Sequence, residues 1–285
     1  MPSEIPYDCE PTLTDSQVIE FCRDGYIILD GVVDPETNQK AVAFLDENPE
    51  WNSTKICRED FFIDNVLKNP AAAGVARSLM GKDFLLPTLM MNHRAECPRA
   101  DLGHWHRDGG VQFKNELNYL LIFYLPEETP KELGPPDILP GSQYIEMKHT
   151  YMRHYGNIKG TLATPCSAGT IIIMHHNIWH RSTVSTRTGI RNMLKYEYRR
   201  TTPPKRDWIV EADLDIRTKN FRMKNSFMES WQDCQTVAEL FLWLCGYDDW
   251  EFEGAQIWPT IASYFPDPEA YMPGVPEQFR LNDSS

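Results

Sequence analysis

His104-Trp105-His106-Arg107-Asp108-Gly109-Gly110 is the stretch around which the rest of the chain is organised. In an extended strand the side chains alternate between the two faces, so His106 and Asp108 point the same way. An imidazole and a carboxylate placed like this can occupy neighbouring positions on one metal ion. A third ligand must then come from another part of the chain.

The best candidate for the third ligand is His180, which ends the segment 168–180. In that segment a glycine precedes a β-branched run that closes on histidine. Two imidazoles and one carboxylate on a single face of iron leave three coordination positions open, which is the arrangement of non-haem Fe(II) oxygenases. The sequence therefore predicts an Fe(II) site formed by His106, Asp108 and His180.

Arg191 follows eleven residues after His180, at the start of a strand-like run over 192–198. A guanidinium is a rigid, permanently charged fork that matches a carboxylate. Arg191 is thus suited to hold the far end of a keto acid that chelates the iron. Ser182, two residues after His180, could add a hydroxyl group.

Taken together, these residues resemble the phytanoyl-CoA dioxygenase family of Fe(II)/2-oxoglutarate oxygenases. The resemblance covers about residues 12 to 200 and rests on Trp105 to Asp108, Gly134-Pro135-Pro136, Pro140-Gly141-Ser142, Gly169, His180 and Arg191. The combination is far more specific than a bare His-x-Asp pair. The resemblance implies that His106, Asp108 and His180 bind iron, and that Arg191 and Ser182 bind the C5 carboxylate of 2-oxoglutarate.

Two positions depart from the pattern of that family. Gln143 stands where the family usually has histidine, and Ser185 stands where it usually has asparagine. Both positions lie outside the predicted ligands of the metal and of 2-oxoglutarate. They leave the metal chemistry intact and weaken any inference about the substrate.

Helix signals are concentrated near the N-terminus. Thr14 and Gln17 form a capping pair, and Gly25 ends the helix that they begin. Asp34-Pro35 predicts the start of a second helix running to about residue 47, and a small-residue helix is expected over 71–80.

Short strands with turn signals between them dominate the rest, over 84–96, 117–125, 161–176 and 191–199. This pattern indicates a mainly β fold with an antiparallel jelly-roll core, the double-stranded β-helix of cupin-like proteins. A chain of 285 residues with 41% hydrophobic residues can bury a core of that size as one domain. We expect a single oxygenase domain over 1–285.

Beyond residue 200 the resemblance fades, but the composition is not that of a linker. An amphipathic helix is expected over 229–245, and the tail after it holds Trp250, Phe252, Trp258, Tyr264 and Phe265. The extension 201–285 is expected to pack on the barrel, to cover its mouth as a lid, or to form a dimer contact. The protein is accordingly a monomer or a homodimer.

Net charge and cysteine usage narrow the range of partners. A net charge of -13 and a pI of about 5.1 argue against nucleic acid or an anionic membrane as the main partner and favour a small molecule. Seven scattered cysteines without a Cys-x-x-Cys pair fit neither a disulfide framework nor a zinc ribbon. No signal-peptide pattern opens the chain, so a cytoplasmic location is expected.

Several residues near the predicted site have two interpretations. His104 lies two residues from His106 and could replace Asp108 in a ligand pair, although mixed imidazole and carboxylate ligation suits open iron sites better. His175 and His176 are interpreted as strand residues that do not bind the metal. Arg187 competes with Arg191 and is interpreted as a surface residue in a turn.

Two further residue pairs are expected to share a strand face by their spacing. Asn92 and Arg94 could line the cavity or face solvent. Lys195 and Glu197 should lie on the same face as Arg191, and one or both could touch substrate if that face points inward.

The predicted activity is oxidation of an unactivated C–H bond of a small molecule, most simply its hydroxylation, with desaturation or ring formation as further outcomes. The resemblance implies Fe(II), 2-oxoglutarate and O2 as cofactor and cosubstrates, release of succinate and CO2, and stimulation by ascorbate. Asp108 argues against halogenation, because halogenases of this broad class lack the carboxylate ligand.

The family's substrates include acyl-CoA thioesters, amino-acid derivatives and specialised metabolites, and the aromatic extension favours a specialised metabolite. One alternative from another class is a non-catalytic jelly-roll protein that binds metal in a regulatory role. Another is a cupin-like hydrolase or isomerase that uses a different divalent metal and needs neither Arg191 nor oxygen.

Overall fold

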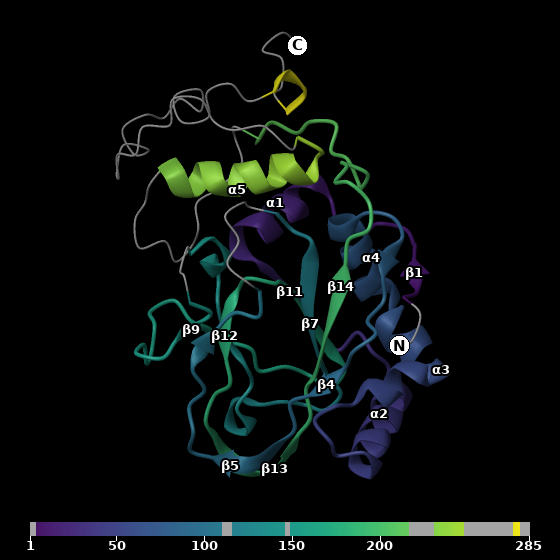
Figure 1. Cartoon of the computed structure of the whole chain (residues 1–285), viewed down its shortest axis with the longest axis vertical. Helices are drawn as coiled ribbons and strands as arrows, with labels where there is room; N and C mark the ends of the chain where they lie inside the picture. Colours follow the sequence, from purple (N-terminus) through teal and green to yellow (C-terminus); the bar gives the residue numbers. More distant parts are fainter. Residues whose placement is uncertain (1–3, 110–115, 146–148, 217–230, 248–275, 280–285) are drawn as a thin grey trace.

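Two antiparallel sheets with helices on one flank make up the centre of the protein (Figure 1). The structure, a computed structural model, describes residues 4–109, 116–145, 149–216, 231–247 and 276–279. Within the described residues no helix is both long enough and apolar enough to cross a membrane.

The first helix, α1 (Asp15–Asp24), begins and ends where the sequence predicted. The Thr14 hydroxyl accepts from the Gln17 amide, and the Gln17 side chain accepts from the Thr14 amide at 2.9 Å, which completes the capping box. Gly25 ends the helix in the left-handed region at φ +80°.

The remaining N-terminal helices are also close to expectation. α2 spans Pro35–Glu47, with Asp34 accepting from the Thr37 amide at 2.9 Å. α4 spans Pro70–Met80 and ends at Gly81. Between them lie the short elements η1 (Thr54–Arg58), α3 (Asp60–Phe62) and η2 (Ile63–Leu67).

The larger sheet has seven strands, in the order β1, β3, β14, β7, β11, β2, with β4 also paired to β14. Their bounds are Pro6–Tyr7 (β1), Tyr26–Leu29 (β2), Phe84–Leu85 (β3), Met91–Asn92 (β4), Tyr119–Leu125 (β7), Thr170–His175 (β11) and Leu194–Arg199 (β14). In Figure 1 helices α2 and α4 lie to one side of β7 and β14, and β12 lies to the other.

The smaller sheet has five strands, in the order β10, β8, β12, β6, β9. Its strands are Trp105–His106 (β6), Asp137–Leu139 (β8), Tyr151–Met152 (β9), Leu162–Ala163 (β10) and Trp179–Arg181 (β12). A separate pair joins β5 (Ala95–Arg99) to β13 (Ser185–Arg191), and the short helices η3 (Lys131–Leu133) and η4 (Ser142–Tyr144) connect strands.

Alternating side chains of β11 pack into two different hydrophobic clusters, one on each side of the strand. Ile171 and Ile173 pack into the cluster under the helices, whereas Ile172 and Met174 pack with Phe123 between the two sheets. A strand that is buried on both faces must be apolar at every position, which explains the continuous apolar run in its sequence. The two facing antiparallel sheets confirm the predicted jelly roll.

Two strand predictions were wrong in detail. The expected strand over 84–96 is divided into β3, β4 and β5, with Pro87 in the segment that leaves the sheet. Arg191 is the last residue of β13 and does not begin the next strand. The break follows because the chain changes sheets here: β13 pairs with β5, whereas β14 pairs with β7. Between them the side chain of Asn192 accepts from Asn92 at 3.0 Å and donates to Glu127 at 3.1 Å.

The described part of the C-terminal extension packs against α1. Helix α5 (Trp231–Leu244) lies across α1 in Figure 1, and Phe241 contacts Trp208 with ring centroids 6.1 Å apart. The buried Asp15 carboxylate at the start of α1 accepts from Arg206 and from the Trp208 indole at 2.7 Å. The predicted helix is therefore confirmed over 231–244, while the tail aromatics from Trp250 to Phe265 lie outside the described residues.

Candidate active site

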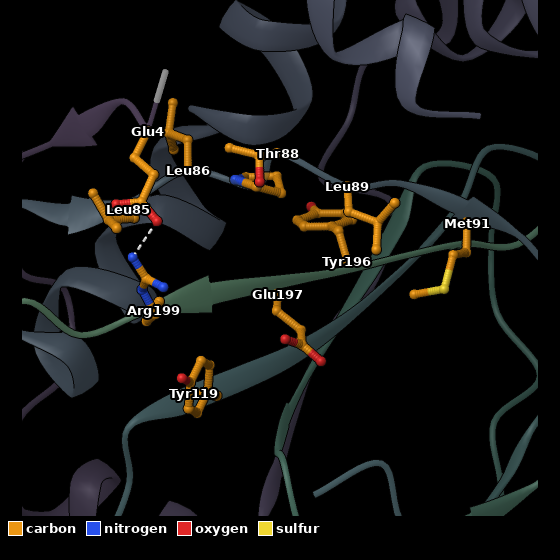
Figure 2. Close-up of a pocket in the computed structure, with 11 residues that line it drawn as sticks. Glu4, Leu85, Leu86, Thr88, Leu89, Met91, Tyr119, Tyr196, Glu197 and Arg199 are labelled. Atoms are coloured by element: carbon orange, nitrogen blue, oxygen red, sulfur yellow. Dashed lines mark hydrogen bonds and ion pairs between the residues drawn. The ribbon is translucent and has the colours of Figure 1, made fainter. Parts of the chain in front are cut away.

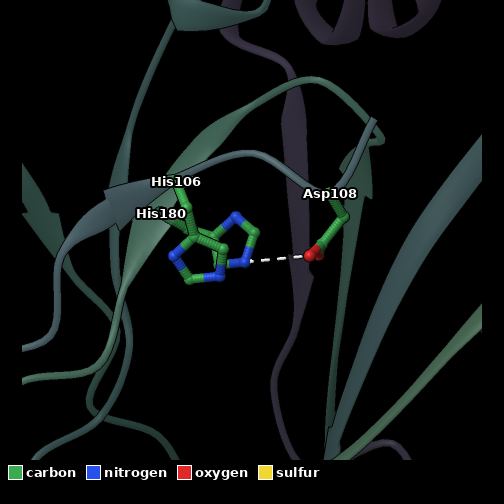
Figure 3. Close-up of side chains that lie close together, drawn as sticks. All are labelled: His106, Asp108 and His180. Atoms are coloured by element: carbon green, nitrogen blue, oxygen red, sulfur yellow. Dashed lines mark ion pairs between the residues drawn. The ribbon is translucent and has the colours of Figure 1, made fainter. Parts of the chain in front are cut away.

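The smaller sheet brings together the three predicted metal ligands. His106 on β6 and His180 on β12 are directly paired across adjacent antiparallel strands, and Asp108 follows β6. One ligand atom from each of the three side chains lies within 4.8 Å of the others (Figure 3). His104 is exposed and is not part of this group.

Each histidine turns the same ring nitrogen toward the group. The Nδ1 atoms of His106 and His180 lie 3.0 Å and 3.1 Å from the backbone carbonyls of His104 and Ile178. A ring that donates from Nδ1 to a carbonyl keeps the lone pair on Nε2, which is the form that binds a metal. Burial lowers the pKa of His180 to about 3, which keeps this imidazole neutral.

Asp108 completes the group with a charged carboxylate. Its Oδ2 atom lies 3.4 Å from His180 Nε2 and 2.5 Å from Lys195 Nζ. Burial alone raises the pKa of Asp108, but the nearby His180 and Lys195 outweigh burial and hold the pKa below its usual range. The carboxylate oxygen that faces the histidines thus already pairs with a cation, and two imidazoles with one carboxylate fit a divalent iron ion.

The loop that carries Asp108 passes tightly over the end of β11. A Cβ atom at Gly109 would overlap Asn177 Oδ1 and lie 2.9 Å from His176 Nδ1. Only glycine lets the backbone approach this closely. Gly109 therefore fixes where the neighbouring Asp108 stands relative to the histidines.

Packing around the histidines restricts their orientation. The Tyr151 ring stacks on His106 with centroids 5.8 Å apart, and the edge of Phe123 meets His180 at 5.5 Å. Arg181 donates to Asp137 and lies 4.6 Å from the Trp105 ring, which ties β12 to both of its neighbouring strands. Such surrounding contacts hold metal ligands in a fixed geometry before the metal arrives.

Arg191 and Ser182 line the same cavity as the two histidines. This cavity has a volume of about 300 Å³ and is lined by Trp51, Asn92, His93, Arg94, Arg99, His106, Phe123, Pro136, His180, Arg181, Ser182, Arg191, Met193 and Lys195. Arg191 is only 5% exposed, and its Nη1 atom donates to the Gly134 carbonyl. Its Nε atom has no hydrogen-bond partner among the described residues, so the guanidinium can still bind an anion.

The structure also locates the other residues that the sequence singled out near the site. Asn92 and Arg94 both line it and both donate to Asn192 Oδ1, at 3.0 Å and 3.2 Å. His175 is buried and its Nδ1 accepts from the Asn177 amide, so it does not belong to the metal group.

His176 lies 2.8 Å from Glu197 and is likewise outside the metal group. Arg187 is exposed, as expected, but it belongs to strand β13 and not to a turn. Lys195 lines the cavity and pairs with Asp108, so its side chain points inward. Glu197 lines a separate pocket, and Arg191 does not share a strand with these two residues because it belongs to β13.

The two positions that depart from the family pattern have structural partners. Gln143 donates from Nε2 to the Cys22 carbonyl at 2.9 Å, which joins η4 to the end of α1. The hydroxyl of Ser185 accepts from the Arg99 amide at 2.8 Å, which joins β13 to β5. Neither residue lines the cavity that holds the histidines.

His93 also lines the cavity, although its sequence position did not predict this. Period-two alternation places His93 on the face opposite to Asn92 and Arg94, yet all three line the cavity. Strand β4 ends at Asn92, and the His93 amide then bonds to the Met193 carbonyl at 2.9 Å. No local sequence signal reveals this change of direction, because it depends on a residue 100 positions away.

Comparisons with known proteins agree with the fold. A sequence profile described as Phytanoyl-CoA dioxygenase (PhyH) matches residues 21–193. L-proline trans-4-hydroxylase of Streptomyces griseoviridis is 23% identical over 170 residues, which make up 48% of this chain and 62% of that enzyme. The match thus spans less than two thirds of the length of this curated relative.

Two solved structures have similar folds. HygX from Streptomyces hygroscopicus, with nickel and 2-oxoglutarate bound, has a TM-score of 0.52 and 13% identity, over 67% of this chain and 88% of HygX. The epimerase SnoN, in complex with Fe3+, alpha ketoglutarate and nogalamycin RO, has a TM-score of 0.51 and 17% identity, over 65% of this chain and 82% of SnoN.

The comparisons confirm the predicted fold and family. The profile match covers more than half of the chain. The protein therefore belongs to the phytanoyl-CoA dioxygenase (PhyH) family.

Proposed function

We propose that the protein is an Fe(II)- and 2-oxoglutarate-dependent dioxygenase that hydroxylates an unactivated C–H bond of a small molecule. One observation carries the proposal: His106 and His180, which belong to the candidate metal group, line the same cavity as a buried arginine. A metal site alone would fit many enzymes. A metal site that shares a cavity with a carboxylate-binding guanidinium fits an enzyme that uses a keto acid.

In this proposal His106, Asp108 and His180 hold the iron. The two histidines offer Nε2, and Asp108 offers the oxygen that faces His180. Three protein ligands leave room for a cosubstrate and for oxygen. When bound, iron and 2-oxoglutarate supply the oxidising chemistry, in which 2-oxoglutarate and O2 are consumed and succinate and CO2 are released.

Arg191 and Ser182 hold the C5 carboxylate of 2-oxoglutarate. Arg191 is buried and keeps its positive charge, because a guanidinium is not deprotonated in proteins even where burial lowers its pKa. The Gly134 carbonyl orients the guanidinium from one side. A carboxylate that pairs with it would offset the cost of burying this charge.

Two buried apolar side chains narrow the space that is open to water in the cavity. Phe123 and Met193 line it together with the histidines, while Trp51 in the same lining is 59% exposed. Excluding water strengthens the electrostatic interactions inside the cavity and protects a reactive oxidant from side reactions. Positioning one C–H bond in this space determines where the substrate is oxidised.

We infer a small-molecule substrate and favour a specialised metabolite. The cavity volume of about 300 Å³ suits a small molecule, and the related fold of SnoN is described in complex with nogalamycin RO. Desaturation or ring formation could follow from the same site. We further propose that residues 1–285 form one catalytic domain, because the described part of the C-terminal extension is bonded to α1 through Asp15.

The test is turnover of 2-oxoglutarate by the purified chain with Fe(II), ascorbate and air. Succinate formation should be present in the wild type and should fall at least about tenfold in Asp108→Ala and in Arg191→Ala. Arg187→Ala removes an exposed arginine from the same strand and serves as the matched control. Undiminished succinate formation in both cavity variants would refute the proposal.

A further inference from the structure

The cavity beside the metal group carries more positive charge than the proposed cosubstrate needs. Three arginines besides Arg191, together with Lys195, line it, and no aspartate or glutamate is found among its described lining residues. The whole chain carries a net charge of -13, so the positive charge of this cavity is opposite in sign to the charge of the chain as a whole. A local surplus of one sign indicates a ligand of the opposite sign.

Two of the five cations pair with carboxylates outside the metal group, and Arg99 is exposed to solvent. Arg94 pairs with Asp46 at 3.0 Å, and Arg181 pairs with Asp137 at 2.9 Å. Lys195 pairs only with Asp108 among the ion pairs of the described residues, at 2.5 Å, and its side chain is 8% exposed. The lysine therefore depends on a carboxylate that the proposed function assigns to the metal.

Binding of the metal changes the balance of charge around Lys195, provided that the proposed function holds. A ferrous ion bound to Asp108 has one formal positive charge left over. That charge and Arg191 together balance the two negative charges of 2-oxoglutarate. The Lys195 ammonium is then a buried cation without a counter-charge, which is costly unless an anion binds beside it.

We propose that Lys195 binds the carboxylate of the substrate, so that the enzyme acts on a small carboxylic acid. His93 lines the same cavity, and its buried Nε2 atom has no hydrogen-bond partner among the described residues. This ring nitrogen can donate to the second oxygen of the same carboxylate. Lys195 thus selects a substrate with a negative charge, and the hydrogen bond from His93 orients the substrate carboxylate.

Glu197 limits where the substrate carboxylate can lie. It is two residues beyond Lys195 on β14 and lines a separate pocket of about 170 Å³ together with Tyr119, Met91 and Arg199 (Figure 2). Its carboxylate bonds to His176 at 2.8 Å, beside the loop that holds Asp108. A substrate carboxylate would be repelled beside Glu197, so Lys195 is the favoured position for the charged end of the substrate.

The carboxylate at Lys195 could also belong to 2-oxoglutarate, and the experiment must separate these two sources. The full-length chain is loaded with Zn(II), which does not support turnover, and 2-oxoglutarate binding is measured first by calorimetry. Three acids (L-proline, hexanoic acid and trans-cinnamic acid) are then titrated into the loaded protein, each beside its primary amide. The variants are Lys195→Met, Lys195→Arg and the exposed control Arg187→Ala.

At least one acid should bind the loaded wild type about tenfold or more tightly than its amide. That preference should disappear in Lys195→Met, persist in Arg187→Ala and return in part in Lys195→Arg. Affinity for 2-oxoglutarate should change less than about threefold in Lys195→Met, and the unfolding temperature of each variant shows whether it is folded.

Three results would overturn the inference: equal binding of acids and amides, binding of no acid in the panel, or a loss in Lys195→Met that falls on 2-oxoglutarate. Failure of the proposed function looks different. In that case the loaded wild type does not bind 2-oxoglutarate at all, whatever residue stands at position 195.

Discussion

His106 and His180 stand directly opposite one another on the adjacent strands β6 and β12, with ring centroids 4.3 Å apart. Antiparallel pairing between two strands of the smaller sheet thus places two imidazoles on the same face, although 73 residues separate them in sequence. Burial lowers the pKa of His180 to about 3, so this ring is neutral and available to a metal ion at neutral pH.

This pairing predicts a clear difference between neighbouring histidines. His180→Ala should weaken Fe(II) or Co(II) affinity at least about 100-fold, because it removes one of three ligands. His104→Ala should change the affinity less than about twofold, since His104 is exposed and contributes only its backbone carbonyl to the site. Anaerobic calorimetry of the metal-free protein measures both, and equal losses in the two variants would contradict the ligand assignment.

Gly109 offers a test of how Asp108 is positioned. Gly109→Ala should lower metal affinity about tenfold, because the added methyl group would overlap Asn177 and displace the loop. Gly156→Ala is the control, since a Cβ atom there has no heavy atom within 4 Å. The same titration applies. Wild-type affinity in Gly109→Ala would show that the close approach of this loop does not determine the position of Asp108.

Arg191 should affect the cosubstrate and not the metal. Arg191→Met is expected to raise the KM for 2-oxoglutarate about 30-fold or more while leaving Co(II) affinity within about twofold of the wild type, because a buried charged hydrogen bond to the C5 carboxylate is lost. The exposed Arg187→Ala controls for the loss of one positive charge. A variant that loses metal affinity to the same degree as cosubstrate affinity would indicate a structural role for Arg191.

Buried histidines should make the metal-free protein sensitive to acid. Burial lowers the pKa of His175 to about 3, whereas an unfolded histidine titrates near its ordinary value of about 6.5. Below about pH 6.5 the unfolded chain therefore binds a proton that the folded chain does not, and stability falls by up to about 1.4 kcal/mol per pH unit for this residue.

His175→Asn keeps an acceptor for the Asn177 amide and removes the titrating ring. Urea unfolding between pH 8 and pH 4 should give a shallower loss of stability in His175→Asn than in the wild type, with the difference at pH 8 as the reference. Parallel curves for the two proteins would contradict the assignment of a depressed pKa.

The parts of the fold that local chemistry controls could be predicted from the sequence. The capping box of Thr14 and Gln17 and the glycine after α1 depend on neighbours within one turn, and both were found where expected. The spacing of His106 and Asp108 on one strand is equally local. These features need no knowledge of which distant segments meet.

Features that depend on distant segments could not be predicted. The strand break at Asn192 arises because β13 pairs with β5 and β14 pairs with β7, and both partner strands are far away in the sequence. The sequence predicted which face of the strand Lys195 occupies, but not that the side chain contacts Asp108. Strand alternation shows the direction of a side chain and does not show which distant residue it meets. The inward position of His93 had no sequence signal at all.

The most direct test of the account is the location of iron in a crystal of the protein grown anaerobically with Fe(II) and 2-oxoglutarate, measured by anomalous diffraction at the iron edge. The account predicts one strong peak between Nε2 of His106, Nε2 of His180 and a carboxylate oxygen of Asp108, with Arg191 in contact with the cosubstrate. A peak elsewhere, or a cosubstrate that does not touch Arg191, would contradict it.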